Sequence, residues 1–416
     1  MSHGAILQFP PGFLWGTATS PTQVEGHIDN EWTQFTAQDG GTCRIACDHY
    51  HRYPEDIDWM AQLGTSAHRF GIEWSRLQSG PFAPLNQPEL ARYVDVLDRL
   101  LAKGITPMVV LHHFSNPPWV NAAGGWTNAA VIPAFVDYVR QLVAALRGRV
   151  YLWNTFNEPD TYACVAYLLG GFPPQHKWQL GKFRRVIGHM ARAHVQASRI
   201  IRREGVFAGR QPEVGIAKNW TFFHAHHPFS LWDRATAFGC HYTFNKFVLD
   251  AFLGGWRRKA STFIGLNYYG RARFHHFRAM IPASGAPVKT LKEFGFVCDD
   301  MVERYPEGLG KILAYLHRKF QLPIYITEHG AASHDEAFRE RDLRENLAAL
   351  HAAMAAGVDV RGFFYWSLLD NFEWQFGYTK KFGLLAVDFA DPKLPRTPKA
   401  LAEVYSKICR NNFLQG

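Results

Sequence analysis

Eight short apolar segments that alternate with longer amphipathic segments predict an α/β fold, a closed (β/α)8 TIM barrel, for this chain of 416 residues. Two further observations favour a barrel. Polar and aromatic residues follow most of the apolar segments, as expected where an active site forms at the C-terminal ends of barrel strands. An open doubly wound sheet often has a glycine-rich phosphate loop after its first strand, but here that place reads Thr19-Ser-Pro-Thr-Gln-Val-Glu-Gly26.

The apolar segments are interpreted as buried parallel strands, because they are apolar on both faces and rich in β-branched or aromatic residues. In chain order they are Phe13–Ser20, Ser66–Trp74, Pro107–Phe114, Val150–Glu158, Glu213–Trp220, Thr262–Tyr269, Pro323–His329 and Gly362–Leu368. Eight such strands are the number that closes a barrel of this type.

The segments between the strands have apolar residues at helical spacing. In Pro88–Lys103, for example, Leu90, Leu97 and Leu101 fall on one face of a helix. The same pattern predicts helices over Val131–Leu146, Lys182–Arg203, Gly308–Phe320, Leu343–Ala356 and Pro398–Cys409. Gly104 and Gly357 stand where glycine commonly ends a helix. Thr397 is expected to cap the last helix, with Pro398 as its first residue.

No linker, repeat or low-complexity segment divides the chain. We therefore expect residues 1–416 to form a single barrel domain, with its core at about residues 8–410. Phe222–Ala260 and Arg271–Glu307 contain the longest irregular stretches, and we expect them to be loop insertions at the C-terminal face of the barrel.

The composition excludes several classes of protein. Hydrophobic residues make up 47% and charged residues 19%, which is typical of a globular chain and not of a disordered one. The net charge of +9 is scattered and lies in no recognisable nucleic-acid module, so no nucleic-acid partner is expected. No segment has 18 consecutive uncharged apolar residues and no signal peptide is evident, so no membrane association is expected. The six cysteines are dispersed, and a reducing cytoplasm is the simplest location.

The polar residues at the ends of the predicted strands are the first evidence for function. Two of these strands end in glutamates, Glu158 and Glu328. The other strand ends carry Gln23 and Glu25, Arg69 and Glu73, His112 and His113, Asn267 to Tyr269, and Trp366 followed by Asp370 to Trp374. A lone glutamate at a strand end is more often a structural ion-pair partner. Two carboxylates at one barrel mouth, however, can act as general acid and nucleophile on a glycosidic bond.

Seven motifs occur in an order that is characteristic of one family. They are Phe13-Leu-Trp-Gly-Thr-Ala-Thr-Ser20, Ala46-Cys-Asp-His-Tyr-His-Arg-Tyr53, Arg69-Phe-Gly-Ile-Glu-Trp-Ser-Arg76, Thr155-Phe-Asn-Glu-Pro159, Gly265-Leu-Asn-Tyr-Tyr269, Ile326-Thr-Glu-His-Gly330 and Tyr365-Trp-Ser-Leu-Leu-Asp-Asn-Phe-Glu-Trp374. With these motifs the chain resembles glycoside hydrolase family 1, the β-glucosidase family, from about residue 8 to about residue 408. The resemblance implies a retaining, exo-acting β-glycosidase, first of all a β-glucosidase, with β-galactosidase or β-fucosidase as side activities.

The resemblance also implies a role for each matched residue. Glu158 would be the general acid/base and Glu328 the nucleophile, with the carboxyl groups about 5–5.5 Å apart as in retaining enzymes. Arg69 would lower the pKa of Glu328, Tyr269 rather than Tyr268 would donate a hydrogen bond to it, and Asn157 would bind the sugar 2-hydroxyl. The residues expected to bind the non-reducing sugar are Gln23, His113, Glu373 and Trp374, with Trp366 under its apolar face and Phe382 in the pocket wall.

Glu373 favours unphosphorylated β-glycosides, since a buried carboxylate would repel a phosphate, although Lys380 and Lys381 follow closely. The alternatives are a 6-phospho-β-glycosidase and a catalytically inactive sugar-binding homologue, and the presence of both glutamates disfavours the second. A small-molecule β-glycoside is thus the expected partner, with no cofactor and no specified oligomeric state. No metal is expected either, because the histidines at His224–His227 and His275–His276 are interpreted as loop or surface residues.

His329 and Val302 are among the positions that depart from the family pattern. His329 follows the nucleophile where asparagine is usual, which predicts a different local hydrogen bond. Val302 stands where a tryptophan often stacks on the leaving group, so that stacking contact is not expected here.

Overall fold

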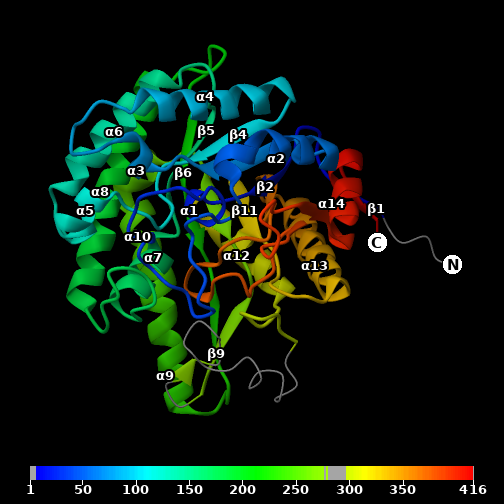
Figure 1. Ribbon diagram of the computed structural model, residues 1–416. Coiled ribbons are helices and arrows are strands. Elements are labelled where there is room, and N and C mark those ends of the chain that lie inside the picture. Colours follow the sequence, from blue (N-terminus) through cyan, green and yellow to red (C-terminus); the bar gives the residue numbers. More distant parts are fainter. Residues whose placement is uncertain (1–5, 276–277, 280–296, 416) are drawn as a thin grey trace.

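The computed structural model describes residues 6–275, 278–279 and 297–415. Its centre is a closed barrel of eight parallel strands surrounded by helices (Figure 1). The strands are β2 (Leu14–Ala18), β3 (Ala67–Gly71), β4 (Thr106–Val110), β5 (Leu152–Asn157), β6 (Glu213–Asn219), β8 (Ile264–Asn267), β11 (Ile324–His329) and β12 (Val360–Trp366). Each predicted apolar segment overlaps one of them, although β4 and β12 begin one and two residues before their predicted segments, so the predicted fold class is confirmed.

The barrel closes because its last strand pairs with its first. β12 runs parallel to β2, from Gly362 opposite Leu14 to Trp366 opposite Ala18. Apolar side chains fill the interior, and a larger apolar core lies between the strands and the surrounding helices. Burial of both strand faces explains why the sequence shows continuous apolar segments and no alternation.

The six predicted helices are present with shifted ends. They are α4 (Gln87–Ala102), α6 (Val131–Ala145), α8 (Leu180–Glu204), α12 (Pro306–Phe320), α13 (Glu336–Ala355) and α14 (Ala400–Asn411). Gly104 and Gly357 follow α4 and α13 with φ of 72° and 93°, the left-handed conformation expected just beyond a helix.

The predicted start of the last helix is wrong. Arg396–Pro398 forms β14, which pairs with β13 (Leu385–Val387), and Lys399 is the residue that precedes α14. Thr397 lies opposite Ala386 in this ladder, so strand pairing determines its conformation and it does not cap the helix.

The insertion at Phe222–Ala260 is more regular than predicted. It contains β7 (Phe222–Ala225), α9 (Leu231–Cys240), a π-helix at His241–Phe247, α10 (Val248–Leu253) and a 3-10 helix at Gly255–Ala260. β7 pairs in parallel with β9 (Arg271–His275), which also pairs with β10 (Arg278–Ala279), and α9 and β9 project from the lower side of the barrel in Figure 1. The second predicted insertion, Arg271–Glu307, lies partly outside the described residues.

Several elements were not predicted from the sequence. The longest is α2 (His49–Leu63), which has Pro54 inside it. The shorter helices are α1 (Pro21–Val24), α3 (Trp74–Leu77), α5 (Pro118–Ala122) and α7 (Pro159–Tyr167), with 3-10 helices at Gly125–Thr127 and Trp374–Phe376. β1 (Ile6–Gln8) pairs antiparallel with β15 (Phe413–Gln415), and β1 lies beside α14 in Figure 1. Among the described helices, none is long and apolar enough to cross a lipid bilayer. All six cysteines are free thiols.

Candidate active site

The carboxylate of Glu328, on β11, is held by two donors. Arg69 on β3 donates from Nη1 to Oε1 at 2.5 Å, and Tyr269, two residues after β8, donates from Oη to Oε2 at 2.7 Å. Tyr268 instead donates to the carbonyl oxygen of Tyr305. Because Arg69 is 0% and Glu328 3% exposed, this is a desolvated, charge-assisted pair in which neither partner can turn to water.

The pKa of Glu328 reflects both its burial and its neighbours. The pKa of Glu328 is raised to about 7. Burial is the main cause; Arg69 lowers the pKa and the Glu158 carboxylate raises it. The guanidinium therefore acts in the predicted direction, but burial outweighs it. A proton on Glu158 removes the negative charge that raises the pKa of Glu328, so protonating Glu158 favours the ionised form of Glu328.

Glu158 directly follows β5 in a left-handed conformation, with φ of 39°. Its backbone N–H donates to the carbonyl oxygen of Ala217 at 2.8 Å, which ties this strained residue to β6. Its Oε1 accepts from Nδ2 of Asn267 at 2.7 Å, and its Oε2 accepts from Nδ2 of Asn219 at 3.0 Å. The Thr327 hydroxyl donates to Oδ1 of Asn267 at 2.6 Å and so fixes the orientation of that amide. Two strand-end amides thus position the Glu158 carboxylate.

Asn157 connects the surroundings of the two glutamates. Its Oδ1 accepts from Nη2 of Arg69 at 2.6 Å and from Nδ2 of Asn267 at 3.1 Å. Arg69 is held in turn by Asn154, whose Oδ1 accepts from Nε at 3.0 Å. Glu328 and Glu158 are therefore linked through one guanidinium and two amides at the same end of the barrel, where a short polar network can hold both carboxylates in fixed positions.

His113, which follows β4, is a neutral member of this network. Burial lowers its pKa well below the ordinary value, and Arg69 lowers it further. Its Nε2 lies 2.9 Å from Nδ2 of Asn157, so Nε2 accepts and the proton is assigned to Nδ1. Among the described residues Nδ1 has no hydrogen-bond partner, which leaves one N–H donor for a ligand.

Gln23 and Glu373 form a second polar group. Nε2 of Gln23 donates to Oε2 of Glu373 at 3.0 Å and to Oδ1 of Asn371 at 3.0 Å. Oε1 of Gln23 has no partner within the described part of the chain. Burial raises the pKa of Glu373 to about 8, and the negative charge of Glu328 raises it as well. Buried polar atoms that lack partners suit a ligand with many hydroxyl groups.

The aromatic residues predicted for the site lie close to His113 and Tyr269. The His113 ring centre lies 6.0 Å from that of Trp366 and 5.9 Å from that of Trp374. The rings of Tyr269 and Phe382 are 6.0 Å apart. Trp366, Trp374 and Phe382 are each at most 5% exposed. All the residues predicted for catalysis and sugar binding therefore lie in one connected region, where flat apolar faces border hydrogen-bonding groups.

Other polar residues predicted at strand ends have structural partners instead. Glu25 pairs with Arg76 at 2.8 Å and with Arg92 at 3.2 Å, and Glu73 accepts from the Ser115 hydroxyl at 2.8 Å. His329 is fully buried, with Nδ1 2.7 Å from the carbonyl oxygen of Tyr268 and Nε2 3.2 Å from Oδ2 of Asp342. His329 therefore contacts the backbone just after β8 and a carboxylate of α13. Both of its ring nitrogens lie beside groups other than the Glu328 carboxylate.

Sequence reasoning missed Asn154 and Asn219. The sequence does carry a signal for Asn219, because it is a polar residue near the end of a predicted strand, Glu213–Trp220. Asn154 lies inside an apolar strand, and nothing in the sequence distinguishes it from a buried structural amide. Asn267 was noted at a strand end but was given no role.

A buried ion pair that was also not predicted lies beside Glu158. Nζ of Lys218, on β6, donates to Oδ2 of Asp160 at 2.8 Å, and the two residues are 1% and 0% exposed. Burial raises the pKa of Asp160 to about 7, whereas Lys218 lowers it and Glu158 raises it. Burial lowers the pKa of Lys218, and Asp160 and Glu158 oppose that shift. The ionised form of each residue is therefore stabilised by the opposite charge of its partner.

Replacing Lys218 alone is expected to destabilise the fold strongly. Lys218→Met leaves the Asp160 carboxylate buried without its cation, at a cost of about 3–5 kcal/mol in the free energy of unfolding. The double variant Asp160→Asn with Lys218→Met removes both charges and is expected to be less destabilised than Lys218→Met alone. Urea unfolding of these two variants and of Lys407→Met, which removes a largely exposed surface pair with Glu403, measures these differences. A double variant no more stable than Lys218→Met would contradict the pairing argument.

Comparison with known proteins places these features in a family. The sequence profile of glycosyl hydrolase family 1 matches residues 6–257 and 251–413. Beta-glucosidase A of Thermotoga maritima is 33% identical over 462 aligned positions, which cover 99% of each chain. The 1,4-beta-D-glucan glucohydrolase of Thermotoga neapolitana is 32% identical, and the alignment covers 98% of this chain and all of that protein.

Solved structures agree with the sequence comparison. The family 1 β-glucosidase from Thermotoga maritima superposes with a TM-score of 0.86 at 29% identity, covering 99% of this chain and 100% of that one. A β-glycosidase from Pyrococcus horikoshii gives 0.85 at 31% identity, covering 99% and 97%. Structures of the Thermotoga maritima enzyme are described in complex with glucoimidazole and with deoxynojirimycin.

Proposed function

The chain belongs to glycosyl hydrolase family 1 and is a retaining β-glycosidase, and on this premise we propose that Glu158 and Glu328 are its catalytic pair. One observation supports the assignment above the others. Glu328 is held through both oxygens by Arg69 and Tyr269, and its guanidinium partner is connected to the Glu158 site through Asn157. A fixed, ionisable carboxylate beside a second carboxylate is the arrangement that double displacement requires.

In the first step a carboxylate oxygen of Glu328 forms a bond to the anomeric carbon while the bond from that carbon to the leaving oxygen breaks. Glu158 transfers its proton to the leaving oxygen, so the alcohol departs neutral. Both Glu158 oxygens accept amide hydrogens, so this carboxyl group is held in place while its proton is directed at the substrate.

In the second step water attacks the anomeric carbon and gives a proton to Glu158. The bond between the anomeric carbon and Glu328 breaks, which restores both carboxyl groups and gives a product with the original β configuration. Arg69 and Tyr269 stabilise Glu328 as its negative charge returns. We propose that Asn157 binds the sugar 2-hydroxyl during both steps.

We further propose that Gln23, His113, Glu373 and Trp374 bind one unphosphorylated non-reducing sugar, with Trp366 and Phe382 against its apolar surface. The buried Oε1 of Gln23 and the Nδ1–H of His113, which lack partners among the described residues, supply an acceptor and a donor for hydroxyl groups. Hydroxyl donors would favour the ionised form of Glu373. The bound partner would be a small-molecule β-glycoside, with glucose as the preferred sugar.

Rates on matched aryl β-glycosides test this pocket. We expect hydrolysis of the β-glucoside, slower hydrolysis of the galactoside and fucoside, and little hydrolysis of the 6-phosphoglucoside. Glu373→Ala removes the acceptors for two sugar hydroxyls. Because a hydrogen bond to a charged group contributes about 1.5–3 kcal/mol, the loss of two should lower kcat/KM for the glucoside by about 10²-fold or more. Faster hydrolysis of the phosphorylated substrate would favour a 6-phospho-β-glycosidase, and binding without turnover would favour an inactive homologue.

We also propose that residues 1–416 act as one catalytic unit, because residues 6–8 pair with residues 413–415 and so connect distant parts of the described chain. The six free thiols support the proposal of a reducing, cytoplasmic environment.

A further inference from the structure

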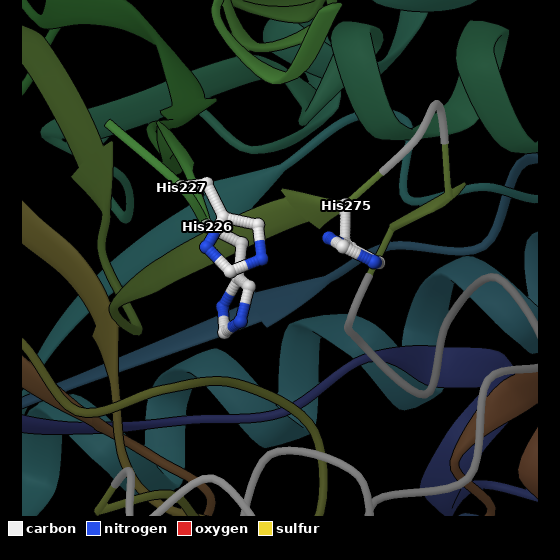
Figure 2. Close-up of side chains that lie close together, drawn as sticks. All are labelled: His226, His227 and His275. Carbon is white, nitrogen blue, oxygen red and sulfur yellow. The ribbon is translucent and has the colours of Figure 1, made fainter. Parts of the chain in front are cut away.

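Three histidines meet where the two insertions, Phe222–Ala260 and Arg271–Glu307, pair with each other through β7 and β9. His226 and His227 follow β7, and His275 is the last residue of β9 (Figure 2). One ring nitrogen from each lies within 4.8 Å of the other two. The ring centres of His227 and His275 are 5.0 Å apart, and those of His226 and His275 are 5.4 Å apart. Their approach could not be expected from the sequence, because α9, α10 and the barrel strand β8 lie between His226 and His275 in the chain.

The backbone around this cluster is fixed by pairing. β7 and β9 run parallel with Ala225 opposite Phe274, and the His226 N–H donates to the carbonyl oxygen of Phe274 at 2.8 Å. The three imidazoles therefore sit at the ends of two paired strands, so the approach of their side chains is a consequence of strand register. A site built on paired strands is better defined than one on a free loop.

A fully buried carboxylate lies behind the cluster. Oδ2 of Asp233, near the start of α9, accepts from the His227 backbone N–H at 3.1 Å and lies 3.8 Å from Nδ1 of His275. A carboxylate on one nitrogen of an imidazole favours the tautomer that presents the lone pair of the other nitrogen to a metal, and it makes that nitrogen more basic. At 3.8 Å the Asp233 carboxylate is beyond hydrogen-bond distance of His275, so a small rotation of the His275 ring is needed for Asp233 to support it in this way.

From this arrangement we propose that His226, His227 and His275 bind one divalent transition-metal ion, with Zn²⁺ as the representative case. Imidazole nitrogens suit Zn²⁺, Cu²⁺ and Ni²⁺, whereas Mg²⁺ and Ca²⁺ prefer oxygen ligands. Three protein ligands leave a fourth position for water. The site lies outside the catalytic residues, is independent of the glycosidase proposal, and differs from the sequence prediction of no metal.

The cluster needs only a small adjustment to bind the ion. Zn–N bonds of about 2.0–2.1 Å in a tetrahedral site place ligand nitrogens about 3.3 Å apart, so the rings must close by about 1.5 Å or less. His226 and His275 are half-buried and His227 is exposed, so rotation about side-chain bonds can supply this movement. The nearby cation Arg273 is paired with Glu303, which accepts from it at 2.7 Å and 3.1 Å and also pairs with Arg271.

Metal binding would cross-link β7 to β9 and so stabilise the insertion that begins after β6, because a ligand that binds only the folded state shifts unfolding to higher temperature. Competition from thiols is expected to be small. Burial raises the pKa of Cys164 to about 12 and that of Cys240, in α9, to about 11, so these thiols stay protonated and bind metal poorly.

Calorimetric titration of the chelator-treated full-length chain with ZnCl₂ tests the site. We expect the wild type to bind one equivalent, and His227→Ala and His275→Ala each to weaken binding at least about tenfold, since each removes a ligand. Asp233→Asn keeps the ligands and is expected to weaken binding about 10-fold, the lower end of the usual effect of a supporting carboxylate. Visible absorption of the Co²⁺ form should show an intense tetrahedral band that both histidine variants lose.

Two control variants separate this site from other histidines. His224→Ala changes a neighbour on β7 outside the cluster, and His51→Ala removes a candidate ligand from another group among the described residues, His27, Asp48 and His51. Both controls should keep the wild-type stoichiometry and affinity, and glycosidase activity with and without chelator shows whether each variant is folded. The proposal is overturned if the folded wild type binds no Zn²⁺, or if His227→Ala and His275→Ala bind it as tightly as the wild type.

Discussion

Replacing Glu328 with alanine is expected to lower kcat for an aryl β-glucoside by at least about 10⁴-fold, which corresponds to more than about 5 kcal/mol of activation free energy. The variant lacks the oxygen that bonds to the anomeric carbon, so the first displacement has no nucleophile. Initial rates on an aryl β-glucoside measure the loss. Glu89→Ala, which removes a carboxylate that accepts from Tyr50 away from the site, is the matched control and should retain most activity.

Added azide provides a second test of the role of Glu328. In Glu328→Ala a small anion can occupy the space of the lost carboxylate and attack the anomeric carbon from that side, with Glu158 still protonating the leaving oxygen. The product should be the α-glucosyl azide, because a single displacement inverts the configuration. A β-glucosyl azide, or wild-type hydrolysis by the variant, would show that another residue is the nucleophile.

Replacing Glu158 with glutamine is expected to lower the rate by an amount that depends on the leaving group of the substrate. Loss of general acid catalysis should lower kcat/KM by about 10²–10⁴-fold for substrates whose alcohol needs a proton to depart. A dinitrophenyl glucoside, whose phenolate departs without a proton, should keep most of its kcat/KM. Initial rates on a series of aryl and alkyl β-glucosides measure this divergence, and an equal loss on every substrate would argue against the acid role.

The same variant should change the pH dependence. Glu328 must be ionised to attack, so kcat/KM for the dinitrophenyl glucoside is expected to fall as the pH drops through the Glu328 pKa of about 7. The Glu158 carboxylate raises that pKa, and Glu158→Gln removes its charge. The acid limb should therefore move to lower pH in Glu158→Gln, whereas an unchanged or higher limb would show that the two groups do not interact.

The fold and most of the site could be predicted from the sequence because both depend on residues at strand ends. Burial on two faces makes barrel strands continuous apolar segments, and the polar residue that ends each segment lies at the active end. This reasoning located Glu158 and Glu328, whereas the role of Arg69, which lies within β3, came from the family resemblance; the structure brings the three side chains together. The start of α14 could not be obtained this way, because pairing of β13 with β14 overrides the helix-start pattern at Thr397 and Pro398.

Features that depend on long-range contacts were also beyond the sequence. The Asp160 and Lys218 pair joins α7 to β6, and each residue alone reads as an ordinary charge on its element. The pKa of Glu328 depends on how far burial raises it and how far Arg69 lowers it, and a sequence motif contains no information on burial. The histidines after β7 and at the end of β9 approach one another only because the two strands pair in register.

The covalent bond between the sugar and Glu328 is the central claim, and trapping it is the most direct test. A 2-deoxy-2-fluoro-β-glucoside with a dinitrophenyl leaving group slows both steps, but its good leaving group lets the first proceed, so the glycosyl-enzyme should accumulate. Mass spectrometry of the intact protein and of its peptides is expected to show one fluoroglucosyl group, located on Glu328 and lost on incubation with an acceptor alcohol. A label on any other residue, or no label on an enzyme that hydrolyses β-glucosides, would contradict the proposed mechanism.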